Sequence, residues 1–145
     1  MERYTIDEIY YNLDVARDGL YDSFANSVCE ALSFLDKKIV DEISKKVLFF
    51  SSDYIRDSTS CHLMLNTSFS KDRKMVIFYS EEILKGSKKE IIKKILHEIA
   101  HFYLNHKQCF DLNKKQIGKQ EKEADKLARR WLKNGFRENR YSRFK

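Results

Sequence analysis

Residues 87–106 read SKKEIIKKILHEIAHFYLNH and carry the clearest pattern in this chain. Ser87 and Glu90 have the spacing of a capping box, in which a hydroxyl and a carboxylate three residues later each bond a free backbone N–H at a helix start. Gly86 interrupts the chain directly before them. Apolar residues then recur at three- and four-residue intervals, which is typical of one face of an amphipathic helix. The stretch predicts a helix that runs from Ser87 to about His106.

Two histidines lie four residues apart on this helix, in the sequence His97-Glu98-Ile99-Ala100-His101. Side chains at this spacing point the same way, so that two imidazoles can share one zinc ion. The glutamate between them can act on a water at an open coordination position. At 100° per residue the two histidines fall nearly opposite the centre of the apolar arc, which argues against ordinary helix histidines. The pattern predicts a metal site.

A catalytic zinc ion needs a third protein ligand, and the next predicted helix, residues 119–134, offers carboxylates for it. Its first residues read EKEAD, from Glu121 to Asp125. Glu121 and Asp125 are four residues apart and share one face of the helix. Glu123 is a rival third ligand. The residue pattern leaves the choice between the two glutamates open.

HEIAH followed about twenty residues later by EKEAD resembles the gluzincin pattern HExxH…ExxAD. The setting resembles the ImmA/IrrE metallopeptidases, short cytoplasmic proteins with a strand such as KMVIFYS before the helix and a Leu-x-His such as residues 104–106, LNH, after it. The resemblance covers about residues 60–132. It implies that Glu121 is the third zinc ligand and that Asp125 orients a ligand histidine without binding the ion itself.

The chain departs from related patterns at several positions. Ala100 stands where ImmA-like proteins often have glycine, and the helix-turn-helix domain of some relatives is absent, so the resemblance identifies no repressor or other target. A metzincin would need glycine at 104 and histidine at 107, where this chain has Leu104 and Lys107. His106 is one position short of that pattern, and we expect it at the surface or behind a metal ligand.

The rest of the chain predicts helices around a small sheet. A capping box at Thr5 and Glu8 opens a short helix, and apolar spacing from Leu20 to Ile43 predicts one long helix. Three apolar runs predict strands, the last two antiparallel, at residues 47–50, 61–65 and 75–79. The expected fold class is α+β: a single zincin-like domain over residues 1–145, with a short, mainly antiparallel sheet packed on helices. An edge at Met75–Ser80 could hold an extended substrate by strand addition, although for Val76 and Phe78 we favour a place in a core strand.

Composition favours an ordinary globular domain in the cytoplasm. The chain has 42% hydrophobic and 34% charged residues and no proline. Its first residues, MERYTIDEIYYNLD, lack the apolar run of a signal peptide, and no stretch approaches the length of a membrane span, so we expect no membrane association. Three scattered cysteines predict reduced thiols, with Cys29 in the core.

The net charge of +6 is concentrated near the C-terminus. From residue 126 onward eight Lys and Arg residues accompany one acidic residue, Glu138, and residues 136–145 form a basic tail with interleaved aromatic residues. Such a segment can bind nucleic acid. We favour the simpler interpretation, a solvated helix face followed by a tail.

These observations predict a zinc metallopeptidase with one Zn²⁺ per chain, acting on an intracellular protein or peptide such as a regulatory protein. Zinc lowers the pKa of a bound water from 15.7 to about 7, and Glu98 takes its proton as the general base. Candidate donors to the oxyanion are Tyr103, Tyr79 and His62. The alternative is a zinc-stabilised regulatory or nucleic-acid-binding module with little or no proteolysis. The intact Glu98 argues against it, because a purely structural site needs no base.

Overall fold

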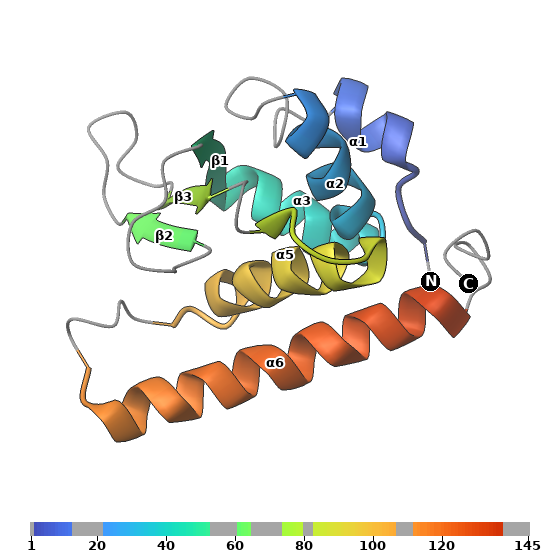
Figure 1. The fold of residues 1–145 in the computed structure, drawn as a ribbon. Coiled ribbons are helices and arrows are strands. Elements are labelled where there is room, and N and C mark those ends of the chain that lie inside the picture. Colours follow the sequence, from blue (N-terminus) through green and yellow to red (C-terminus); the bar gives the residue numbers. More distant parts are fainter. Residues whose placement is uncertain are drawn as a thin grey trace.

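Two long helices, α5 (Lys88–Tyr103) and α6 (Lys114–Arg137), lie antiparallel along one side of the computed structural model (Figure 1). The structure describes residues 2–12, 22–52, 61–64, 74–79, 83–106 and 112–137. The remaining described elements lie above α5 in the view of Figure 1: α1 (Ile6–Asn12), α2 (Asp22–Leu32), α3 (Lys37–Lys46), β1 (Val47–Ser52), β2 (Cys61–Met64) and β3 (Lys74–Tyr79).

The expected fold class, α+β with a mainly antiparallel sheet, is wrong for this chain. Helices make up most of the described residues, and the strands form one small sheet in the order β1-β3-β2. The longer ladder is parallel, pairing Val47–Ser52 with Lys74–Tyr79, and only β2 and β3 pair antiparallel, as predicted. Because β2 lies between β1 and β3 in the sequence, no tight turn joins those two strands, and they are free to run parallel.

The position of β3 bears on where a substrate could add to the sheet. Met75–Ser80 was considered as an edge for an extended substrate, with a core strand preferred for Val76 and Phe78, and β3 is the central strand, with both of its edges paired. In the described sheet only β1 and β2 have an outer edge. Strand addition to this sheet would therefore occur at β1 or β2.

The single long helix expected from Leu20 to Ile43 is two helices, α2 and α3. Between them the chain turns at Ser33, whose hydroxyl bonds the Glu30 carbonyl, and the backbone N–H groups of Phe34 and Leu35 bond carbonyls three residues back. Phe34 and Leu35 are themselves fully buried. A turn made of buried apolar residues preserves the apolar spacing, which is why the pattern did not reveal the break.

Both predicted capping boxes are present. Thr5 and Glu8 exchange side-chain-to-backbone hydrogen bonds of 2.7 and 3.1 Å at the start of α1, and Ser87 and Glu90 do the same at the start of α5. Gly86 precedes the second box with a φ of +105°, and a Cβ there would lie 2.1 Å from the Glu90 carboxylate. The positive φ favours glycine at this helix entry, because a side chain there would be strained and would also displace the Glu90 carboxylate from the capping box.

The last helix is longer than the predicted 119–134. It begins after Asn113, whose side chain accepts from Gln116 N–H while Gln116 accepts from Asn113 N–H. It also continues past residue 134, where the predicted helix ends, through Gly135 to Phe136 and Arg137 of the predicted tail. Residues 138–145 lie outside the described residues.

The hydrophobic core lies between α2, α3, α5 and α6. Ala124 and Ala128 of α6 are fully buried, as is Cys29 of α2, which was predicted to be a core residue. Burial raises the pKa of the Cys29 thiol to about 12. Gly135 faces the core at a point where a Cβ would lie 2.2 Å from the Phe34 ring. Small residues along one side of α6 thus let it approach its neighbours closely.

No described helix combines the length and the apolar character needed to cross a membrane.

Candidate metal centre

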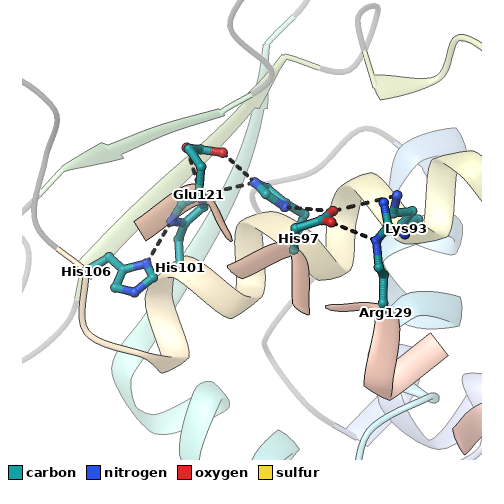
Figure 2. A network of polar contacts seen from close by, with 7 residues as sticks. Lys93, His97, His101, His106, Glu121 and Arg129 are labelled. Atoms are coloured by element: carbon teal, nitrogen blue, oxygen red, sulfur yellow. Dashed lines mark hydrogen bonds and ion pairs between the residues drawn. The ribbon is translucent and has the colours of Figure 1, made fainter. Parts of the chain in front are cut away.

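The two histidines of HEIAH meet on one side of α5, facing α6 (Figure 2). The Nε2 atoms of His97 and His101 lie 3.1 Å apart, and their rings meet edge to face. Their side chains are 20% and 17% exposed, so both are largely covered but still reach solvent. The helix thus brings together two imidazole nitrogens, as their four-residue spacing requires.

Glu121 of α6 lies over both histidines. Its Oε2 is 3.0 Å from His97 Nε2, and its Oε1 is 3.1 Å from His101 Nε2. Among the described residues, these three form the group of His, Cys, Asp and Glu side chains able to hold a metal ion, with donor atoms all within 4.8 Å of one another. Two different helices, α5 and α6, therefore contribute to one donor set.

The pKa values of Glu121 and His97 reflect this close approach of the three side chains. Hydrogen bonds from His101 and His97 lower the pKa of Glu121 well below its usual range, despite partial burial. Burial alone would lower the pKa of His97, but the hydrogen bond to Glu121 and the charges of Glu98, Glu121 and Asp125 outweigh it and raise that pKa. The site thus concentrates negative charge around two imidazoles, an environment that favours a cation.

Asp125 lies one turn further along α6, on the other side of the His97 ring. Its Oδ1 is 3.9 Å from His97 Nδ1 and 3.6 Å from Lys93 Nζ, and its Oδ2 accepts a 2.7 Å hydrogen bond from Arg129. Desolvation raises the pKa of Asp125, but the Arg129 hydrogen bond and the nearby positive charges lower it overall. Asp125 therefore stays ionised beside the nitrogen of His97 that points away from Glu121.

His106 and Glu123 form a second contact behind His101. His106 Nδ1 lies 2.9 Å from His101 Nδ1, and His106 Nε2 lies 3.2 Å from Glu123 Oε2. The His106 side chain is only 7% exposed. Glu123, the rival third ligand, is thus engaged with His106. Residues 121 and 123 point about 200° apart around a helix, so both cannot face the same pair of histidines.

The end of α5 explains how His106 reaches His101. Asn105 adopts a left-handed conformation with φ of 57°, and its N–H bonds the Phe102 carbonyl. The N–H of His106 bonds the His101 carbonyl. These two bonds form a Schellman motif, which ends the helix and folds the following residue back onto its last turn. Asparagine tolerates the left-handed region better than most residues, so the asparagine in LNH is consistent with a helix end at this position.

The remaining candidate site residues are not among the three metal-binding donors. Glu98 is half-buried on α5 and lies near enough to His97 to raise its pKa. Tyr103 is 38% exposed and is turned about 200° around α5 from His101, away from the donor set. His62 and Tyr79 lie in β2 and β3, but their side chains are outside the part of the chain that the structure describes.

The donor set fits zinc. Two imidazole nitrogens and a carboxylate oxygen are the ligands of many catalytic zinc sites, which leave the fourth position open. Bonds of about 2.1 Å at tetrahedral angles would separate the two nitrogens by roughly 3.4 Å. The observed 3.1 Å differs from that by a few tenths of an ångström, which small side-chain rotations can supply.

Comparison with known families indicates a class of activity. A family model described as Peptidase U49 matches residues 94–145, a segment that contains His97, Glu98, His101 and Glu121. This part of the chain resembles a family of peptidases. The match supports a peptidase family in general and does not identify the ImmA/IrrE family specifically. Searches of curated proteins and of solved structures find no match to this chain.

Proposed function

We propose that this chain is a zinc-dependent metallopeptidase with a gluzincin-type ligand set. His97, His101 and Glu121 hold the ion, and Glu98 is the general base. The observation that carries the proposal is the convergence of two imidazoles and a carboxylate from two helices, with donor atoms within 4.8 Å. The similarity of residues 94–145 to a peptidase family supports it.

Glu98 and Asp125 have separate roles beside the ion. A bound zinc ion supplies Lewis acidity toward a water and toward the scissile carbonyl. Glu98 receives the proton that the attacking water loses and passes it from its carboxylate to the leaving amine nitrogen. Asp125, held by Lys93 and Arg129, keeps a negative charge beside His97 Nδ1 and so favours a proton there and a free Nε2.

The test separates metal binding from catalysis. The wild-type chain should hold about one zinc per molecule by elemental analysis, and His97→Ala should not. Glu98→Gln should keep its zinc and lose activity by about 10²–10⁴-fold, because only the base is removed. Activity is measured as cleavage of denatured casein and of proteins encoded beside this one. Undiminished cleavage by Glu98→Gln would move the chemistry to another residue.

We further propose that the substrate is a protein or peptide of the cytoplasm, where the sequence predicts this chain to reside. An extended substrate can add to the sheet at β1 or β2, the two outer strands among those that the structure describes. The order of strands thus directs substrate-contact experiments to β1 and β2, and not to β3.

One observation favours nucleic-acid binding as a second candidate function. The side of α6 opposite Ala124 exposes a basic face, made of Lys115, Lys119, Lys122, Lys126, Arg130 and Lys133. If this face binds the phosphate backbone, the affinity of the chain for duplex DNA should fall steeply between about 50 and 200 mM salt. We expect no such binding, since an exposed helix face rich in lysine is also what solubility requires. Salt-sensitive binding without peptidase activity would favour the second function.

A further inference from the structure

His106 is a buried imidazole with both ring nitrogens engaged, one by His101 of the candidate metal centre and the other by Glu123. Nδ1 lies 2.9 Å from His101 Nδ1 and Nε2 lies 3.2 Å from Glu123 Oε2. Only 7% of the His106 side chain is exposed. The His106 ring therefore links Nδ1 of His101, on α5, to the carboxylate of Glu123, on α6.

The contacts allow one arrangement of protons when His101 binds a metal ion. His101 Nε2 must then be free of a proton, so that Nδ1 carries it and donates to His106 Nδ1. His106 Nδ1 accepts, which puts the His106 proton on Nε2. That N–H donates to the Glu123 carboxylate, which can only accept. In this arrangement each N–H faces an acceptor, from His101 through His106 to Glu123.

We propose that His106 and Glu123 are positioning residues that hold His101 in the tautomer and orientation required for binding the metal. This inference rests on the proposed zinc site. Partners behind a ligand histidine fix its ring and raise its basicity, and their loss typically costs 10–100-fold in metal affinity. The Schellman motif at Asn105 is the backbone device that brings His106 into this position.

The two ligand histidines are held differently. Asp125 Oδ1 lies 3.9 Å from His97 Nδ1, beyond hydrogen-bond distance, and is shared with Lys93 and Arg129. His101 has a direct 2.9 Å contact to a neighbour that is almost fully buried. His101 is therefore the more firmly oriented of the two ligands, and the His106 contact should contribute more to zinc affinity than Asp125 does.

Paired substitutions at His106 and Glu123 test the proposal through zinc affinity, measured by competition with a chelator. His106→Leu keeps a bulky side chain without an acceptor and should weaken zinc binding on the order of 10–100-fold. His106→Asn places a carbonyl oxygen near the position of Nδ1 and should lose less than about tenfold. Glu123→Gln keeps an acceptor for His106 and should likewise bind zinc more tightly than Glu123→Ala.

Two controls separate positioning from folding. Thermal unfolding of the metal-free variants in chelator reports their stability, and the exposed Glu123 should tolerate substitution even if His106→Leu unfolds. Long-range ¹H–¹⁵N spectra of the zinc-loaded wild type at about pH 8, where ordinary imidazoles are neutral, should show the His106 proton on Nε2.

The outcomes are distinguishable. A wild-type chain that binds no zinc would overturn both the proposed function and this inference. Wild-type zinc affinity in His106→Leu and Glu123→Ala, or a proton on His106 Nδ1 in the zinc-loaded protein, would overturn the inference and leave the proposed function standing.

Discussion

Glu121 and Glu123 are separated by one residue yet contact different histidines. Glu121 reaches the Nε2 atoms of His97 and His101, whereas Glu123 reaches His106. The direction of each side chain around α6 determines its partner, and therefore its expected role.

Glu121→Gln should weaken zinc binding much more than Glu123→Gln does. A neutral amide at 121 removes an anionic ligand, while an amide at 123 still accepts a hydrogen bond from His106. The two variants carry the same change of charge two residues apart, so each is the matched control for the other. Chelator competition measures both affinities. The reverse order would mean that the other side of α6 faces the zinc ion.

Helix α6 contains two glycines in opposite environments. A Cβ at Gly135 would lie 2.2 Å from a ring carbon of Phe34, which is buried, while a Cβ at Gly118 would meet no atom within 4 Å. Phe136, the next residue, also packs edge to face on Phe34, with ring centroids 5.5 Å apart. The C-terminal half of α6 thus has one face in the core, through Trp131, Leu132 and Gly135, and extends the packed helix into the first two residues of the predicted tail.

Gly135→Ala should destabilise the protein by about 1–3 kcal/mol, because the buried Phe34 ring has to move to make room for the methyl group. Gly118→Ala should instead stabilise it by roughly 0.5–1 kcal/mol, since alanine is the better helix former at an exposed position. Urea unfolding of the two variants measures both changes. Equal effects at the two positions would contradict the close packing of α6 on Phe34.

At the scale of the whole molecule, the candidate zinc site joins α5 to α6. His97 and His101 come from one helix and Glu121 from the other. A metal ion held by these residues binds the folded chain and not the unfolded one, so that its binding free energy adds to the stability of the fold.

Zinc at 100 times its dissociation constant should therefore stabilise the wild-type chain by about 2.7 kcal/mol. Thermal unfolding with zinc and with excess chelator measures the difference. His97→Ala should unfold at the same temperature in both conditions, because it lacks a ligand. A wild-type unfolding temperature that does not respond to zinc would argue that the three donor groups do not hold the ion.

Local features were predictable from the sequence alone. The capping boxes at Thr5 and Ser87 and the helix that carries HEIAH depend on interactions within one or two helical turns, and all are present. The convergence of His97 and His101 depends only on helix geometry. The turn at Asn105 and the cap at Asn113 are local as well, because each depends on residues within about one helical turn.

Other features were decided only by the tertiary structure. Whether Glu121 or Glu123 faces the histidines depends on the rotation of α6 about its own axis relative to α5. Buried residues of α6 such as Ala124 and Ala128 determine this rotation. The parallel pairing of β1 with β3 and the contact of His106 with Glu123 join segments distant in sequence. The turn between α2 and α3 was not evident from the apolar spacing, because its residues Phe34 and Leu35 are as buried as those of the helices. Sequence periodicity reports burial and local geometry, whereas the pairing of distant segments depends on packing of the whole core.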